Sequence, residues 1–443
     1  MGTDPLDVDP IAAGAVRTVR RPRALRGSVS VPGDKSISHR AILHNAIAQG
    51  AARVENLGPG DDVRTSAACM RALGVNVQEI DRCTYLVQGR GLLGLAEPDD
   101  ILDAGNSGTT ARLLAGILAG QSFLTILSGD ESLRSRPMDR VIDPLRAMGA
   151  EALGRRGDDY LPMAIRGGQL RGIDYTLPVA SAQVKSCLLL AGAFAAGATH
   201  LREPAASRDH TERLLAAQGA DITVDGLDIV VRGGRELRAV DITVPGDTSA
   251  AAFWVVAACI HPDAEITVTN IGLSEGRTGL LDVLQEMGAD VRVENRRVVG
   301  GEPVGDITAR SSRLHGVAVG GDLIPRLIDE APILAVAACF AEGATVISDA
   351  QELRYKESDR ISVVAEELTK LGAEIAERPD GMVIAGARRL AGGAGDSHKD
   401  HRMAMALAVA GLVAEEPVSV GQARSVTISY PGFWDDLERL SRA

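Results

Sequence analysis

One unit recurs along the whole chain, and this repetition limits the folds open to it more than any other feature. In each copy a helix-like segment ends in a glycine and a short strand-like run follows, as in "RALGVNV" and "QEMGADV". The glycines are Gly74, Gly149, Gly219, Gly288 and Gly372. Glycine just past a helix adopts the left-handed conformation that reverses the chain into a strand. The chain is therefore predicted to consist of copies of one helix-and-strand unit.

Each copy also contains a helix-length run of small apolar residues. Six such runs occur, at 38–49, 109–120, 184–197, 250–260, 331–340 and 401–415. A helix that is apolar nearly all round must be buried, and strand-like segments separate these runs from the second helix of each copy. The pattern predicts an α/β fold of six βαβαββ units, with the last copy divided between the two termini.

The tetrapeptide "VPGD" occurs twice, before the first and before the fourth buried helix. At 443 residues the chain is too long for one ordinary core, so two lobes of three units each are expected. We place the chain crossings in the two copies of this motif, at 32–33 and 245–246. The lobes are then a continuous one, 33–245, and a discontinuous one, 1–32 plus 246–443. Two adjacent crossings predict a hinge between the lobes.

Composition excludes several classes of function. The chain has 47 basic and 59 acidic residues, a net charge of −12, which argues against nucleic acid or a membrane surface as the main partner. Five scattered cysteines without a C-x-x-C spacing fit reduced thiols and predict a cytoplasmic protein. No apolar run is long enough for a membrane span, and residues 1–20 suggest no role.

Polar loops precede the six buried helices. They read "GDKSIS", "AGNSGTT", "VASAQ", "GDTSA", "LIDEA" and "HKDHR". A helix N-terminus attracts anions, and Ser, Thr and Asp are its usual caps. Helix capping is enough to explain "GDTSA". It does not explain the charged pairs in two other loops, Lys35 with Arg40 and Asp400 with Arg402.

Basic residues concentrate in four places that coincide with such loops. They are Arg112; Arg134, Arg136 and Arg140; Arg354, Lys356 and Arg360; and Arg402. One such cluster could be a solvated charged face, but four at equivalent places predict a cleft between the lobes that binds small, multiply anionic molecules. Carboxylates accompany them at Asp329, Glu330 and Glu357. On the residues alone, these acids either neutralise excess charge or transfer protons.

Other short motifs do not fit their usual functions. "GDKS" lacks the glycine that a Walker A loop has before its lysine, and "GRGLLG" at 89–94 is not followed by a helix. "GLSEG" at 272–276 stands where a hydrolase nucleophile belongs, but the equivalent loop of the first unit has no nucleophile. The histidines show no metal-binding spacing, so no catalytic metal is expected.

From about residue 23 to residue 440 the chain resembles the enolpyruvyl transferase family, and within it the branch whose acceptor is shikimate-3-phosphate. The motifs that carry the resemblance are "PGDKSISHR", "GNSGTTAR", "LRSRPM", "SAQVKS", "ELRYKESDR" and "DHRMAM", in the family's order. The resemblance implies a two-lobed inside-out α/β barrel with three βαβαββ units per lobe, helices inside and sheets outside. The continuous lobe would carry the shikimate-3-phosphate loops. The discontinuous lobe would carry the phosphoenolpyruvate loops and the catalytic acids.

The resemblance also implies the reaction. The enolpyruvyl group of phosphoenolpyruvate would pass to the 5-hydroxyl of shikimate-3-phosphate through a tetrahedral intermediate, with release of phosphate and without a cofactor. This is a step toward chorismate and the aromatic amino acids. Asp329 would be the base, assisted by Lys356, Glu357 the acid, and Lys35 a further catalytic group. The implied shikimate-3-phosphate ligands are Lys35, Ser36, Arg40, Ser181, Ala182, Gln183, Arg208, Asp329 and Lys356. The implied phosphoenolpyruvate ligands are Lys35, Gly108, Arg136, Gln183, Arg360 and Arg402.

The chain departs from the family pattern at three places. Ala182 stands where many members have a second serine, Glu352 and Leu353 where many have Asn and Trp, and Ile428 where many have a lysine. The last change leaves one phosphoenolpyruvate contact open. Because Gly108 is retained, we expect inhibition by glyphosate, and we expect a monomer.

Two alternatives remain. The first is transfer to UDP-N-acetylglucosamine, but many enzymes of that type carry a cysteine in the mobile loop, and the corresponding loop here, "SGDESLRSRPMDR", has none. Asp130 or Asp139 could replace it. The second is a member that only binds anions, which would be expected to lack one of the acids or bases.

Overall fold

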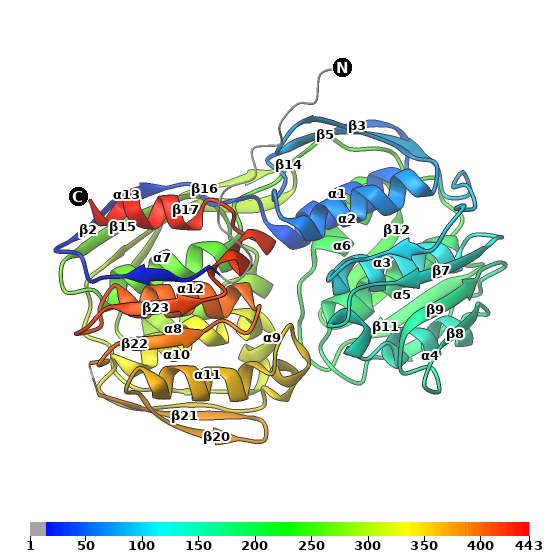
Figure 1. Cartoon of the computed structure of the whole chain (residues 1–443). Coiled ribbons are helices and arrows are strands. Elements are labelled where there is room, and N and C mark those ends of the chain that lie inside the picture. The colour runs from blue at the N-terminus through cyan, green and yellow to red at the C-terminus, as the bar shows by residue number, and fades with distance from the viewer. Residues whose placement is uncertain (1–14, 388, 443) are drawn as a thin grey trace, which may run out of the picture.

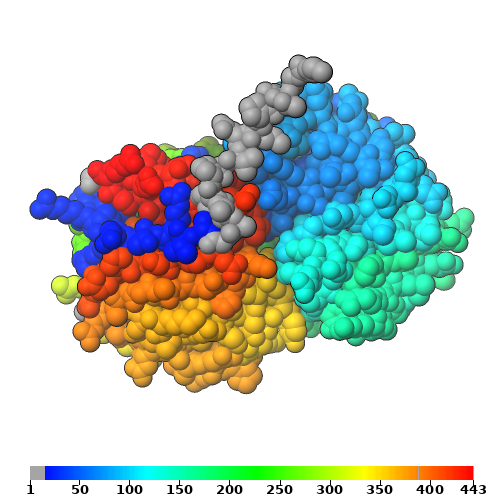
Figure 2. All heavy atoms as spheres, in the orientation of Figure 1, coloured from blue at the N-terminus to red at the C-terminus, as the bar shows by residue number. Residues whose placement is uncertain are grey.

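The computed structural model describes residues 15–387 and 389–442, and they form two bodies that lie side by side (Figure 1). In the space-filling view, residues of the two bodies occupy opposite halves of the surface (Figure 2). None of the helices in the described ranges is both long and apolar enough to cross a membrane. All five cysteines are free, as predicted.

The first body contains three four-stranded sheets, each with two helices. Their strand orders are β14(Ile242–Thr243)-β3(Gln49–Glu55)-β5(Thr84–Arg90)-β4(Asn76–Asp81), β6(Leu102–Asp103)-β7(Leu124–Ser128)-β9(Tyr160–Arg166)-β8(Glu151–Arg155) and β10(Asp174–Thr176)-β11(Ala198–Arg202)-β13(Asp228–Arg232)-β12(Asp221–Asp225). The helices are α1 (Lys35–Ala46), α2 (Asp61–Ala72), α3 (Gly108–Ala119), α4 (Asp139–Ala147), α5 (Ala182–Phe194) and α6 (His210–Ala217).

The second body repeats this plan. Its sheets are β16(Asp290–Val299)-β17(Glu302–Arg310)-β15(Ala264–Gly272)-β2(Leu25–Val29), β18(Ala318–Val319)-β19(Gly343–Ile347)-β21(Gly381–Gly386)-β20(Glu374–Arg378) and β1(Arg17–Val19)-β23(Val418–Gly421)-β22(Gly393–Asp396). Its helices are α7 (Thr248–Ile260), α8 (Gly279–Glu286), α9 (Ile324–Leu327), α10 (Ala331–Cys339), α11 (Arg360–Lys370), α12 (His401–Gly411) and α13 (Phe433–Ser441).

The sheets share one pairing pattern. In every four-stranded sheet one edge strand is parallel to its neighbour and the other pairs are antiparallel. The sixth sheet differs, because among the described residues it has three strands. There β1 from the N-terminal part pairs with β23, and β23 pairs with β22. The sixth unit is thus divided between the termini as predicted, and within residues 15–387 and 389–442 its sheet has three strands where four were expected.

The first and fourth units exchange their parallel edge strands. The N-terminal strand β2 pairs with β15 of the second body, and β14, which precedes α7, pairs with β3 of the first. The chain therefore crosses between the bodies just after each of these strands. The crossing segments run antiparallel: the backbone N–H of Asp34 donates to the carbonyl of Pro245 at 2.8 Å, and that of Asp247 to Pro32 at 2.9 Å.

The predicted apolar helices are buried. Every residue of α3, α10 and α12 is buried, and so is every residue of α1 except Lys35. The outer strands β4, β12 and β20 are mostly exposed, so the sheets cover the helices. The apolar residues form two separate cores, one drawn from 37–244 and the other from 19–31 and 250–440. The α/β class is as predicted, and the strands form six separate sheets.

Candidate active site

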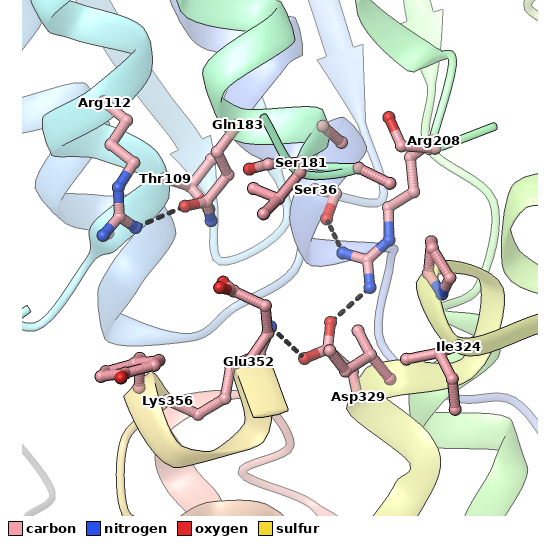
Figure 3. Close-up of a pocket in the computed structure, with 18 of the residues that line it drawn as sticks. Ser36, Thr109, Arg112, Ser181, Gln183, Arg208, Ile324, Asp329, Glu352 and Lys356 are labelled. Carbon is pink, nitrogen blue, oxygen red and sulfur yellow. Dashed lines mark hydrogen bonds and ion pairs between the residues drawn. The ribbon is translucent and has the colours of Figure 1, made fainter. Parts of the chain in front are cut away.

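A cavity of about 330 Å³ lies between the two bodies. Its wall includes twelve of the fourteen residues proposed from the sequence: Lys35, Ser36, Gly108, Arg136, Ser181, Ala182, Gln183, Arg208, Asp329, Lys356, Glu357 and Arg402. Figure 3 shows side chains from both bodies directed toward this space. Residues more than 300 positions apart in the chain thus share one cavity.

In the first body, helix starts place the residues at the cavity. Asp34, Ser107 and Ser181 cap α1, α3 and α5, and each side chain accepts a hydrogen bond from a backbone N–H three residues further on, at 2.9, 3.1 and 3.4 Å. The caps stop each helix at the cavity wall, so its first turn faces the space. They place Lys35 and Gln183 there and direct free backbone N–H groups toward an anion.

In the second body, short 3-10 turns do the same. Asp329 lies in the turn Ile328–Glu330 that leads into α10, and Lys356 and Glu357 follow the turn Gln351–Tyr355 before α11. Arg402 is in the first turn of α12, where Asp400 caps the helix at 2.9 Å. Five of the six buried helices therefore begin with a polar cap, and α10 has a proline in its first turn instead.

Asp329 lies among cations from both bodies. Its carboxylate pairs with Arg208 and lies 3.3 Å from Nζ of Lys356 (Figure 3). It also accepts a hydrogen bond from Arg360 at 3.2 Å. Burial alone would raise the pKa of Asp329, but the surrounding Lys and Arg side chains outweigh burial and hold the pKa well below its usual value. The carboxyl group is therefore ionised, as a base must be.

Glu357 is in a comparable environment. Nη2 of Arg360 donates to its carboxylate at 2.6 Å. Burial acts to raise the pKa of Glu357, but Arg360, Arg136 and Lys35 outweigh it and hold the pKa well below normal. Conversely, burial lowers the pKa of Lys356, and the attraction of the nearby Asp329 carboxylate offsets this lowering only in part. Both carboxyl groups are therefore charged in this structure.

Arg112 of α3 and Arg136, which follows the turn Leu133–Ser135, have no carboxylate partner in the described parts of the chain. Nη1 of Arg112 donates to Gln183 at 2.6 Å, and Nη2 of Arg136 donates to Asn106 at 2.6 Å. Burial, then the neighbouring Arg140 and Arg136, lower the pKa of Arg112 to about 10. Buried cations that repel one another indicate a place for an anion.

The cavity wall as a whole carries eight cationic and six acidic side chains. The cationic side chains are Lys35, Arg112, Arg136, Arg140, Arg208, Arg277, Lys356 and Arg402. The wall is thus net positive although the whole chain carries a net charge of −12. This local excess suits small anionic ligands.

Two of the proposed residues lie behind the wall. Arg40 is buried and donates to Thr211, to Ser186 and to the carbonyl of Ser36, at 2.7, 2.7 and 2.9 Å. Arg360 is buried and donates to Asp400 at 2.8 Å in addition to its contacts with Asp329 and Glu357. In this conformation both guanidinium groups hold other site residues in place.

Several wall residues were not predicted as part of the site. Asp62 accepts a hydrogen bond from Nζ of Lys35 at 3.0 Å, and Glu352 pairs with Arg140 of the other body at 2.8 Å. Arg112 and Arg140 belong to the basic clusters from which the cleft was predicted, but neither was proposed as a ligand; both line the cavity. The sequence feature that could have pointed to Asp62 is the segment "GPGDDV". It leads into α2 of the first unit, as the segment before α8 does in the fourth unit.

Ile428, which replaces a lysine of many members, is not part of the cavity wall. It ends the turn Ala423–Ile428, and its carbonyl packs closely on Gly60 at the start of α2. No basic side chain enters from this position.

One group of side chains in the described ranges has the composition of a metal site, namely Glu366, Glu367 and His398. It does not line the cavity, and Nζ of Lys370 lies 2.8 Å from both glutamates. The ammonium group already offsets part of the charge of the two glutamates.

Fold and site together define a class: two-lobed α/β enzymes that bring small anionic substrates together in a cationic cleft beside paired acid–base groups. The family model described as EPSP synthase (3-phosphoshikimate 1-carboxyvinyltransferase) matches residues 19–437. The chain belongs to the EPSP synthase family.

Individual relatives agree with the family model. Proteins named 3-phosphoshikimate 1-carboxyvinyltransferase from Synechococcus sp. (strain JA-3-3Ab) and Gloeobacter violaceus are each 54% identical to the chain. The matches cover 96% of the chain and 96% and 99% of these relatives. The solved structure of EPSP synthase from Acinetobacter baumannii superimposes with a TM-score of 0.86 at 42% identity, over 96% of this chain and 98% of that one. These findings confirm the resemblance to the shikimate-3-phosphate branch and do not favour the UDP-N-acetylglucosamine alternative.

Proposed function

We propose that the cavity between the two bodies transfers the enolpyruvyl group of phosphoenolpyruvate to the 5-hydroxyl of shikimate-3-phosphate and releases phosphate. The observation that carries the proposal is the pair Asp329 and Glu357, surrounded by cations from both bodies. Two substrates that each bring a phosphate and a carboxylate require several such cations, because each charge-assisted hydrogen bond contributes about 1.5–3 kcal/mol. Electrostatic positioning and proton transfer then suffice for the chemistry.

The helix starts suggest where each substrate lies. Phosphoenolpyruvate would bind at the start of α3, where Arg136 has no carboxylate partner and Gly108 leaves its backbone open, with Lys35, Gln183, Arg360 and Arg402 as further ligands. Shikimate-3-phosphate would bind along Ser36, Arg40, Lys35, Lys356 and the start of α5. Ser181, Ala182 and Gln183 would hold it there, and Arg208 would contact its phosphate. Ala182 can contribute only its backbone N–H.

The substrates themselves would tune the two acids. Arg208 pairs with Asp329 in the structure. A phosphate that attracts Arg208 would free this carboxylate to accept the proton of the 5-hydroxyl, assisted by Lys356. Neutralised cations no longer hold the pKa of Glu357 down, so Glu357 can gain the proton that it gives to the enol carbon. The hydroxyl then attacks the cationic carbon. The tetrahedral intermediate loses phosphate from that carbon and one proton from its methyl group to the carboxylate of Glu357, which restores the enol double bond.

We further propose a division into lobes at 32–33 and 245–246, with 33–245 as one lobe and 1–32 plus 246–443 as the other. Two separate cores and the hydrogen-bonded crossing at Gly33 and Gly246 support it. The two antiparallel crossing segments would be the hinge over which the lobes close.

Finer properties follow from the same reasoning. We propose that the protein is a cytoplasmic monomer, because one chain supplies both walls of the cavity and the cysteines are free thiols. We also propose that glyphosate, a small anion, competes for the phosphoenolpyruvate place at Gly108. A net charge of −12 disfavours nucleic acid and acidic membranes as partners.

Release of phosphate from phosphoenolpyruvate in the presence of shikimate-3-phosphate tests the function. We expect turnover with this acceptor and none with UDP-N-acetylglucosamine. Asp329→Asn and Glu357→Gln should each lower kcat by about 10²–10⁴-fold, the usual contribution of general acid–base catalysis. Glu366→Gln, on the exposed side of α11, is the matched control and should retain full activity. Binding of both ligands without phosphate release would favour the member that only binds anions.

A further inference from the structure

Arg277 is a buried cation at the point where the chain crosses between the two bodies. It ends the 3-10 turn Glu275–Arg277 between β15 and α8, and only 3% of its surface is exposed. Nη2 lies 2.7 Å from Oδ1 of Asp247, 3.0 Å from Oγ of Ser249 and 3.1 Å from Oδ2 of Asp34. One nitrogen thus contacts both crossing segments.

The first set of contacts leads to Lys35. Asp34 caps α1 through its other oxygen, which accepts from the backbone N–H of Ile37 at 2.9 Å. Oδ2 of Asp247 accepts from the backbone N–H of Lys35 at 3.2 Å. Arg277 therefore holds the two carboxylates that set the position of the first residue of α1.

The second set of contacts leads to Asp329. Ser249, which accepts from Arg277, donates its own hydroxyl hydrogen to the carboxylate of Glu330. Glu330 is buried and directly follows Asp329 in the turn that leads into α10. Two hydrogen bonds thus connect Arg277 with the residue next to the proposed base.

The charges make this arrangement depend on Arg277. Asp34, Asp247 and Glu330 are all buried, and Nη1 of Arg277 lies 4.0 Å from Glu330. Three carboxylates so close together would repel one another without a cation between them. Burial would raise the pKa of Asp34, but Arg277 and its other basic neighbours outweigh burial and lower it to about 2.

The repeat shows that this position is used in both lobes with opposite charge. In the first unit the loop before α2 leads into the first turn of that helix, where Asp62 pairs with Nζ of Lys35. In the fourth unit the loop before α8, the "GLSEG" segment and the residue after it, supplies Arg277 to the caps of α1 and α7. Both loops act on the same start of α1, one on its side chain and the other on its backbone.

We propose that Arg277 is a positioning residue for enolpyruvyl transfer. It fixes the position of Lys35 in one lobe relative to that of Asp329 in the other, at the place where the chain crosses between the lobes. Although Arg277 is one of the wall residues, its Nη2 is engaged by Asp34, Asp247 and Ser249, so its effect reaches the substrates through these side chains. The proposal rests on the roles proposed above for Lys35 and Asp329.

Two substitutions test it. Arg277→Lys keeps the charge but lacks the planar group that reaches several acceptors at once. Ser249→Ala removes the connection to Glu330 and leaves every buried charge in place. We expect kcat to fall at least tenfold in Arg277→Lys and at least threefold in Ser249→Ala. KM for either substrate should change less than threefold, because the groups that contact substrate are unaltered.

Ser312→Ala is the control. The half-buried hydroxyl of Ser312 accepts a hydrogen bond from the backbone N–H of Asp290 at 2.9 Å. Ser312 belongs to the same lobe as Ser249 but does not line the cavity. It should retain the kcat of the parent protein. Thermal unfolding of each variant shows whether it is folded, and if Arg277→Lys is not, Ser249→Ala decides alone. A folded Arg277→Lys with parental kcat, or a Ser249→Ala no slower than Ser312→Ala, overturns the proposal. Absence of turnover in the parent protein would instead contradict the proposed function itself.

Discussion

Opposing effects determine the charge of the carboxylates in the cavity. Burial disfavours the ionised form, and nearby guanidinium and ammonium groups favour it. At Asp329 and Glu357 the cations win, and both pKa values lie well below normal. A base can work in this state, but an acid cannot, so Glu357 needs the substrates to change its surroundings.

We predict that Glu357 takes up a proton when the ligands bind. A raised pKa in the complex means more bound proton at a given pH, and the effect should grow as the pH falls from 8 to 6. Calorimetry of shikimate-3-phosphate and glyphosate binding, in buffers of different ionisation enthalpy, measures this uptake. Protonation changes of the ligand phosphate occur in parent and Glu357→Gln proteins alike, so their difference reports on Glu357. Equal uptake in both proteins would contradict the prediction.

At the scale of single elements, the helix starts carry most of the site. Short polar loops cap buried apolar helices, and the same device places Lys35, Gln183 and Arg402 at one cavity. The start of α3 is the most crowded of these. A Cβ atom at Gly108 would lie 2.8 Å from Nη1 of Arg112, which donates to Gln183 at 2.6 Å.

Gly108→Ala should therefore displace Arg112 and lengthen its hydrogen bond to Gln183. We expect KM for phosphoenolpyruvate and the inhibitory concentration of glyphosate to rise at least threefold, with KM for shikimate-3-phosphate nearly unchanged. Steady-state kinetics with each substrate varied in turn measure this. Gly168→Ala serves as the control, because an added Cβ there has no heavy atom within 4 Å. A rise in both KM values alike would argue for general damage to the fold.

At the scale of the whole molecule, the lobes touch through ion pairs across the cavity. Arg140 pairs with Glu352, and Arg208 with Asp329. Partly exposed pairs such as the first contribute about 0.2–1 kcal/mol each, enough to shift the ratio of open to closed molecules a few-fold. Anionic ligands that bind cations of both lobes would favour the closed form further.

We predict that Glu352→Ala increases the open fraction of the unliganded protein. Small-angle scattering should give it a larger radius of gyration than the parent, and shikimate-3-phosphate with glyphosate should reduce that radius more than in the parent. Asp282→Ala, which removes a pair with Arg326 inside one lobe, should scatter like the parent. The same ligand-induced change in Glu352→Ala and parent would count against the prediction.

Much of the fold could be read from local patterns. The glycine-capped helices, the buried apolar runs and the polar caps depend on residues within a few positions of one another, and the structure has them where they were expected. The three-stranded form of the sixth sheet was not predicted, because the number of strands in a sheet depends on pairing between distant segments, such as β1 and β23, which lie some 400 residues apart.

The same distinction between short-range and long-range features applies to the residues of the cavity. Repetition and capping are short-range, so the amino-acid order alone was enough for the α/β class and the polar loops. The family resemblance supplied twelve residues of the cavity wall. The partners of those residues are long-range: Arg208 meets Asp329 across 121 positions, and Arg277 meets Asp34 across 243. Coulomb interactions depend on distance in space and on burial, neither of which a linear sequence contains. The three-dimensional arrangement alone therefore decided which acids are ionised, which arginines are free for a ligand, and how the two lobes are joined.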